Sequence, residues 1–224
     1  MFLLIDKPTG VTSHDVVDKV REVAGEKKVG HGGTLDPNAT GLLIIGIGRE
    51  STRKLGKVAK DTKKTYEAEI FLGEERDTDD AEGVIISRAK GFLPPGKNEI
   101  GKLLTSFIGE QTQIPPAYSA LKIRGKKAYE LARKGEKVSL KKRKIVIHSI
   151  ELVDYEYPIL KIKATVSSGT YIRSLALDIG RKIGSGAYLK NLRRTKIGKF
   201  DVKDAVKLDN LSKNNLSDFV IEID

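Results

Sequence analysis

The stretch "GHGGTLDPNATGLLIIGIG", residues 30–48, presents one carboxylate, Asp36, among glycines, threonines and a proline. The glycines permit tight turns, and Pro37 favours an extended conformation of Asp36. The apolar run at residues 42–47 predicts a buried strand. The stretch therefore predicts a stiff loop that carries one acid and is anchored in a core. Two interpretations of Asp36 follow: a turn residue whose carboxylate bonds a nearby N–H, or a reacting group.

The composition describes a globular chain of 224 residues that is 39% hydrophobic, with a mean hydropathy of −0.31. No apolar run approaches the length of a membrane span, and the first residues lack the features of a secretion signal. The chain has no cysteine, which excludes disulfides and thiolate metal sites. We expect a cytoplasmic protein without membrane contact, a monomer, and neither a metal nor a cofactor.

The net charge of +11 is concentrated in one place. Residues 122–144, "KIRGKKAYELARKGEKVSLKKRK", hold 11 basic and 2 acidic residues and so account for +9 of it. Such a basic run is typical of a solvated face or of a segment that contacts a polyanion. Tyr129 and the glycines in this run favour a segment that lies along a nucleic acid.

Hydrophobic periodicity predicts strands at residues 1–5, 42–47, 65–72, 144–153 and 160–168, and helices at 12–25, 51–59, 98–109 and 169–184. Residues 73–83, "GEERDTDDAEG", predict a loop, because the spacing of their acids fails the calcium-loop pattern. Residues 113–122 contain Pro115 and Pro116 and predict irregular or extended backbone. Strands and helices do not alternate regularly. The pattern favours an α+β fold with a mixed, mainly antiparallel central sheet flanked by helices and loops.

Two further residues are candidates for chemistry. His31 lies five positions before Asp36 and is either a packed residue or one that meets a base. Arg173 falls in the first turn of a predicted helix, where the helix dipole disfavours a cation. It is therefore either solvent-exposed or paired with a carboxylate.

Six blocks together resemble the bacterial tRNA pseudouridine-55 synthases of the TruB family. They are "DKPTGVTSHDVV", "VGHGGTLDPNATGLLIIGIG", "KKTYEAEIFLG" with "DTDDAEG", "QIPPAYSALKIRGKKAYELARKGE", "SSGTYIRSLALDIG" and "LKNLRRTKIGKF". They occur in the family's order over about residues 1–205. The resemblance implies the pseudouridine synthase fold and conversion of uridine 55 in the tRNA T loop to pseudouridine.

The resemblance also implies roles for individual residues. Asp36 attacks the target nucleotide, Tyr66 stacks on the flipped base, and Arg173 pairs with Asp36. His31 meets the RNA near the target, and Leu192 packs in the active site. Residues 115–144 resemble an RNA-gripping insertion, in which we expect phosphate contacts from Lys141, Lys142, Arg143 and Lys144.

Two points remain open within the resemblance. The chain resembles a single catalytic domain over residues 1–224 without the family's C-terminal PUA domain, and a basic residue of the family matches either Arg53 or Lys54. Two other functions fit the same residues: a non-catalytic RNA-binding or RNA-remodelling protein, and a synthase that acts on another RNA stem-loop. Asp36 favours an enzyme over a pure binder, because a carboxylate repels phosphates.

Overall fold

The computed structural model describes residues 1–60, 62–119, 121–123, 125–136 and 138–223. The chain divides into two compact units. Unit 1 comprises Met1–Glu67 and Leu192–Asp224, and unit 2 comprises Ala68–Asn191. Each unit is described by itself.

Unit 1 is a sheet with helices on it. Its strands lie in the order β14-β1-β3-β12-β4, and β2, β13 and β15 are attached at its sides. β1 pairs antiparallel with β3, whereas β1 with β14 and β3 with β12 are parallel. The elements are β1 (Phe2–Lys7), α1 (Ser13–Ala24), β2 (Val29–Gly32), β3 (Thr40–Ile47), α2 (Arg49–Lys60), β4 (Lys64–Leu72), β12 (Ala187–Ile197), β13 (Phe200–Asp201), η1 (Val202–Asp204), β14 (Val206–Lys207), η2 (Leu208–Asn210), η3 (Leu216–Phe219) and β15 (Val220–Ile221).

Side chains alternate along β1 and β3, so each face of this sheet has its own core. One face packs against the valines of α1, and the other packs against Leu55 of α2. α1 begins at a capping box in which Thr12 and Asp15 each accept a backbone N–H from the other. It ends at Gly25, whose φ of 62° suits a residue without Cβ.

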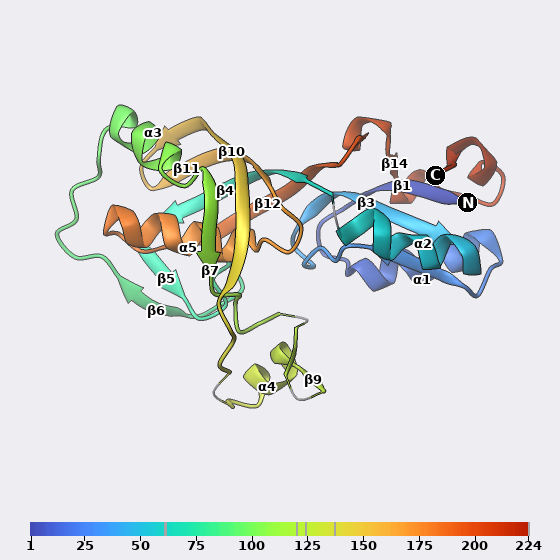
Figure 1. Cartoon of the computed structure of the whole chain (residues 1–224), viewed down its shortest axis with the longest axis horizontal. Helices are drawn as coiled ribbons and strands as arrows, with labels where there is room; N and C mark the ends of the chain where they lie inside the picture. Colours follow the sequence, from blue (N-terminus) through green and yellow to red (C-terminus); the bar gives the residue numbers. More distant parts are fainter. Residues whose placement is uncertain (61, 120, 124, 137, 224) are drawn as a thin grey trace. The chain divides into compact units, whose positions relative to one another are not determined.

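Unit 2 contains strands in the order β12-β4-β11-β10-β7, with antiparallel pairing of β10 to β11 and to β7. Between β7 and β10 the chain leaves the sheet, and α4 and β9 lie at the far end of this excursion (Figure 1). We call residues 114–142 the arm. The further elements are β5 (Glu74–Arg76), β6 (Ile85–Arg88), α3 (Lys97–Thr105), β7 (Gly109–Gln113), β8 (Lys122–Ile123), β9 (Lys126–Lys127), α4 (Ala128–Arg133), β10 (Arg143–Glu156), β11 (Ile159–Val166) and α5 (Ile172–Ile183).

The predicted fold class is confirmed, as are four of its details. The capped helix at residues 12–25, the strand at 42–47, the helix with Arg173 in its first turn and the irregular segment after Gln113 are all present. Tyr66 also lies on the core-facing side of β4, because it is 7% exposed and alternate residues up to Leu72 are buried.

Several element predictions were wrong. Residues 73–83 are not all loop, because residues 74–76 form β5 and pair with β6. The helix predicted to reach residue 109 ends at Thr105, and Gly109 begins β7. β2 and β12 were missed. Among the described residues, no helix combines the length and the apolar character that crossing a bilayer requires.

Candidate functional site

The loop that carries Asp36 is bonded to the segment that runs from the end of β1 to the start of α1. The hydroxyl of Ser13 donates to the carbonyl of Leu35 and accepts the N–H of Leu35, at 3.0 and 2.9 Å. On the other side of Asp36, the carbonyl of Pro37 accepts from Lys7 Nζ at 2.9 Å and from the N–H of Gly10 at 3.0 Å. The main chain is therefore held immediately before and immediately after Asp36.

Asp36 itself is half-buried and opens a turn, in which its carbonyl accepts the N–H of Ala39 at 3.0 Å. The sequence pattern "DPNA" thus forms the turn that Asp-Pro favours. The turn and the held neighbours leave the carboxylate on a short, stiff support.

Arg194 of β12 joins the two ends of the same loop. Its side chain is buried, with Nη2 donating to the carbonyl of Gly33 at 2.9 Å and Nε donating to that of Leu42 at 2.8 Å. A Cβ at Gly33 would lie 3.6 Å from Arg194 Nη1 and 3.7 Å from Lys64 Cε. Both cations therefore lie close to the point where the loop begins.

Burial perturbs the basic side chains in this region. It lowers the pKa of Lys7 to about 8, although the negative charge of Asp36 acts in the opposite direction. Burial, and next the charge of Arg194, lower the pKa of Lys64 to about 8. Burial, the charge of Arg194 and the charge of His14, in that order, lower the pKa of His31. Buried cations are costly unless paired, so their presence together favours an anionic group beside them.

The other predicted residues of unit 1 lie on strands. His31 is in β2, opposite Ile45 of β3, and its Nδ1 is buried without a hydrogen-bond partner. Tyr66 is buried in β4. Leu192 is half-buried in β12, and its carbonyl accepts from the hydroxyl of Thr40 at 3.4 Å, at the end of the Asp36 loop.

Arg173 belongs to unit 2, where it is 5% exposed. Its guanidinium donates to the carbonyls of Thr78 at 3.1 Å and Tyr118 at 2.8 Å, and it forms an ion pair with Asp80 at 3.5 Å. The solvent-exposed interpretation of Arg173 was therefore wrong. Its pairing with Asp36, a residue of unit 1, stays a prediction.

The loop beside Arg173 contains a second perturbed acid. Asp79 has a φ of 61°, in the left-handed region, and burial raises its pKa to about 6 even though Arg173 and Arg181 oppose the shift. This loop bonds itself internally, because the carboxylates of Asp77 and Asp80 accept N–H groups from Val84 and Glu82.

The four predicted phosphate contacts differ from one another. Lys141 and Lys142 are exposed at the end of the arm. The side chain of Lys144 is 86% exposed and lies 3.9 Å from Glu110. Arg143 is only half exposed, and its guanidinium carbon lies 4.6 Å from the centre of the Tyr171 ring. Sequence reasoning missed this contact.

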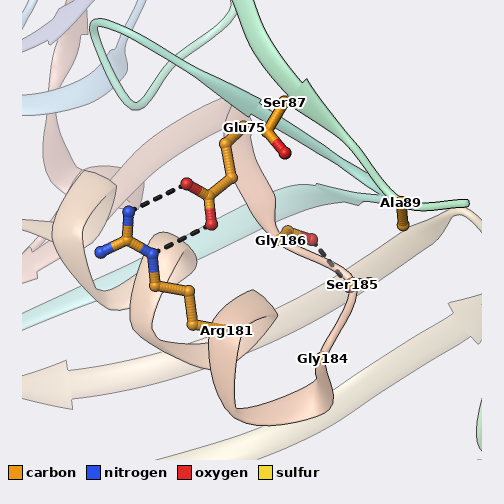
Figure 2. Close-up of a pocket in the computed structure, with 7 residues that line it drawn as sticks. All are labelled: Glu75, Ser87, Ala89, Arg181, Gly184, Ser185 and Gly186. Carbon is orange, nitrogen blue, oxygen red and sulfur yellow. Dashed lines mark hydrogen bonds and ion pairs between the residues drawn. The ribbon is translucent and has the colours of Figure 1, made fainter.

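A pocket of about 250 Å³ lies at the end of α5 in unit 2. It is lined by Glu75, Ser87, Ala89, Arg181, Gly184, Ser185 and Gly186. Figure 2 shows Arg181 and Glu75 joined by two hydrogen bonds, at 3.0 and 2.9 Å. None of the predicted site residues lines it. Across the described part of the chain, no three His, Asp or Glu side chains are grouped so as to hold a metal ion.

Comparison with protein families supports the resemblance. Residues 21–172 match the N-terminal domain of the "TruB family pseudouridylate synthase", and residues 173–218 match the "tRNA pseudouridylate synthase B C-terminal domain". The chain belongs to the TruB family. The predicted single catalytic domain without a PUA domain stays a prediction.

Curated relatives in the TruB family agree over nearly the whole chain. The "tRNA pseudouridine synthase B" of Clostridium kluyveri is 45% identical over 222 residues, which are 99% of this chain and 75% of the relative. The protein of the same name from Aquifex aeolicus is 45% identical over 225 residues, which are 99% of this chain and 77% of the relative.

Solved structures show the same fold. A Cbf5-Nop10-Gar1 complex contains a chain with a TM-score of 0.72 and 29% identity, and an H/ACA RNP bound to a substrate RNA contains one with 0.70 and 26%. These matches cover 94% and 99% of this chain but only 53% and 56% of theirs. This TruB family member thus spans about half the length of those structural relatives.

Sequence reasoning missed four residues of the region around the Asp36 loop: Lys7, Ser13, Lys64 and Arg194. For Lys64 the signal was a basic residue directly before the strand predicted at 65–72, and for Arg194 it was a basic residue within an otherwise strand-like segment. The burial of Arg194 became visible only with its hydrogen bonds to Leu42 and Gly33.

Proposed function

We propose that the chain isomerises uridine 55 in the T loop of tRNA to pseudouridine, with Asp36 as the nucleophile. The names of the curated relatives support tRNA as the substrate, and the TruB family membership supports pseudouridine formation. The observation that carries the assignment to Asp36 is its support, a half-buried loop bonded on both sides of the acid.

The reaction breaks the bond between N1 of the base and C1′ of the ribose, turns the base, and forms a bond between C5 and C1′. The proton on C5 is lost and N1 gains one, so atoms and electrons balance without an oxidant or hydrolysis. A carboxylate can hold the intermediate covalently. This chemistry needs an ionised acid in a fixed place, which matches the stiff support of Asp36.

Four other side chains complete the proposal. The uridine must leave its stack to be reached, and the ring of Tyr66 replaces the lost stacking, which is worth about 1–3 kcal/mol per base. Arg173 pairs with Asp36, because a guanidinium favours the charged form of a carboxylate and fixes its orientation. His31 and Leu192 contact the RNA and the base.

The arm supplies RNA affinity through exposed lysines. Each phosphate that a lysine neutralises releases counterions, so binding falls as salt rises. Tyr129 adds an aromatic surface, which lies 5.4 Å from Lys127 Nζ and 5.5 Å from the guanidinium carbon of Arg133.

Asp36→Asn tests the proposal, with unmodified tRNA as substrate and pseudouridine mapped in the T loop. The amide keeps the size of the side chain and suits a turn, so folding is retained. We expect loss of turnover with RNA binding unchanged or slightly tighter, because one charge that repels phosphate is gone. Asp18→Asn, an exposed acid of α1 paired with Arg21, is the control and retains turnover.

Near wild-type turnover in Asp36→Asn would contradict the assignment of the nucleophile. Unfolding of this variant would show that Asp36 serves the turn. If wild-type protein binds tRNA but forms no pseudouridine, the non-catalytic binder is the better description; if it modifies only other stem-loops, uridine 55 is the wrong target.

A further inference from the structure

The arm is bonded at both ends to the start of α5, the helix that carries Arg173. β7 ends at Gln113, where the arm begins, and β10 starts at Arg143, where the arm ends. These two residues lie opposite each other in the antiparallel register of β7 and β10. Both side chains contact Tyr171, the residue that caps α5.

Gln113 holds the backbone of Tyr171 by two hydrogen bonds. Its Oε1 accepts the N–H of Tyr171 at 2.9 Å, and its Nε2 donates to the carbonyl of Tyr171 at 3.0 Å. That carbonyl also accepts the N–H of Leu175, the first hydrogen bond along this stretch of α5. Gln113 is 1% exposed, and a buried amide of this kind is committed to its partners.

Arg143 contacts the aromatic ring of Tyr171. Its guanidinium lies over Tyr171 and donates to the carbonyl of Gly169, two residues earlier. Burial lowers the pKa of Arg143. A guanidinium used in this way is less available to a phosphate than the exposed Lys141 or Lys142.

Two more hydrogen bonds connect the first residues of the arm with the first turn of α5. The hydroxyl of Ser174 donates to the carbonyl of Ile114 at 2.8 Å, and Arg173 donates to the carbonyl of Tyr118. The beginning of the arm and the first turn of α5 therefore share a continuous set of contacts.

We propose that Gln113 and Arg143 are positioning residues, which fix the first turn of α5, and with it Arg173, to the two ends of the arm. The inference rests on the proposed function of Arg173 and extends it to two residues that do not touch the uridine. It differs from the sequence prediction, in which Arg143 binds phosphate.

Three variants separate these roles. Gln113→Leu removes both bonds to Tyr171 at similar side-chain volume. Arg143→Lys keeps the charge but loses the flat guanidinium, so a phosphate contact would survive and the hold on Tyr171 would not. Gln111→Leu is the matched control, because Gln111 lies in the same strand and its Nε2 bonds the carbonyl of Phe107 instead of α5.

The first measurement is amide hydrogen exchange without RNA. Exchange at Tyr171 and Leu175 becomes about tenfold faster in Gln113→Leu, since local opening of this turn costs less. The acceleration is smaller in Arg143→Lys and absent in Gln111→Leu. Unchanged exchange at Tyr171 in Gln113→Leu would overturn the inference.

The second measurement is steady-state turnover on unmodified tRNA. We expect kcat to fall about tenfold in Gln113→Leu and about threefold in Arg143→Lys, with KM within about twofold of wild type. A raised KM with unchanged kcat in Arg143→Lys would make it a phosphate contact and overturn its positioning role. If Gln113→Leu does not fold, Arg143→Lys decides by the same criteria.

The two proposals fail separately. Absence of pseudouridine with wild-type protein contradicts the proposed function, while the exchange measurement still decides whether Gln113 and Arg143 fix the start of α5. If wild-type protein forms pseudouridine and kcat is unchanged in both Gln113→Leu and Arg143→Lys, only the positioning role is contradicted.

Discussion

Replacing Arg194 by lysine tests whether the two ends of the Asp36 loop depend on one guanidinium. Arg194 is 1% exposed and bonds the carbonyls of Gly33 and Leu42 through different nitrogens. Lysine keeps the charge, but its compact ammonium cannot reproduce the fork, so one carbonyl loses its partner. A buried polar group left without a partner costs about 1–3 kcal/mol.

For a chain of this length, each kcal/mol shifts the unfolding midpoint by about 2–4 °C, so we expect Tm to fall by roughly 2–12 °C in Arg194→Lys. Thermal unfolding followed by circular dichroism measures this. The control is Arg193→Lys, which breaks the two-pronged bond to Asp6 on a side chain that is 38% exposed. Such a pair, in which the arginine is partly exposed, contributes about 1 kcal/mol. A loss in Arg194→Lys no larger than in the control would refute the reasoning.

Three further predictions concern other parts of the chain. Replacing Lys141, Lys142 and Lys144 by glutamine should reduce the slope of log affinity for tRNA against log salt by roughly 2, measured by filter binding between low and physiological salt; an unchanged slope would indicate a solvated face. Asp79→Asn should stabilise the protein by about 1–3 kcal/mol at pH 7.5. The pKa of Asp79 is about 6 in the folded state and 3.8 in the unfolded state, so the wild-type protein loses stability as pH rises from 3.8 to 6. Asn does not ionise and avoids this loss. Urea unfolding at pH 3.5 and 7.5 checks that this advantage disappears in acid. Gly41→Ala should prevent stable folding, because a Cβ there would lie 2.2 Å from a backbone oxygen of β12 and φ is +102°; soluble protein with a wild-type Tm would contradict this.

The parts of the fold that sequence predicted are those whose signals are local. The capping box, the valine stripe and Gly25 all belong to α1 or to its two caps. They therefore determine where the helix begins and ends without the rest of the chain. The alternation from Tyr66 to Leu72 is equally local, because each residue faces the core or solvent by its position in β4.

β12 was missed for a physical reason. It places Arg194 in the interior, where an apolar residue is expected, and the arginine is tolerated there only because two carbonyls from distant segments accept its hydrogen bonds. β2 contains two glycines and a histidine in four residues, a composition that resembles a turn. β12 also pairs with β3, a strand about 150 residues earlier in the chain.

In the candidate site, too, the sequence predicted the local features but not the tertiary contacts. The proline and glycines around Asp36 predicted its loop, but the bonds from Lys7, Ser13 and Arg194 to that loop depend on tertiary structure. For Arg143, the count of charges predicted a phosphate contact, whereas its position opposite Gln113 brings it to Tyr171.

The opposed positions of Gln113 and Arg143 make the arm an exchangeable module. Because β7 and β10 are hydrogen-bonded to each other up to this pair, the spacing of the two attachment points is set by the sheet and not by the length of what lies between them. Segments of other lengths or charges could be transplanted between Tyr118 and Arg143, while the start of α5 keeps its contacts with Gln113, Ile114, Tyr118 and Arg143. The choice of RNA and the chemistry at Asp36 would then be separately adjustable, which offers a route to synthases directed at RNAs of other shapes.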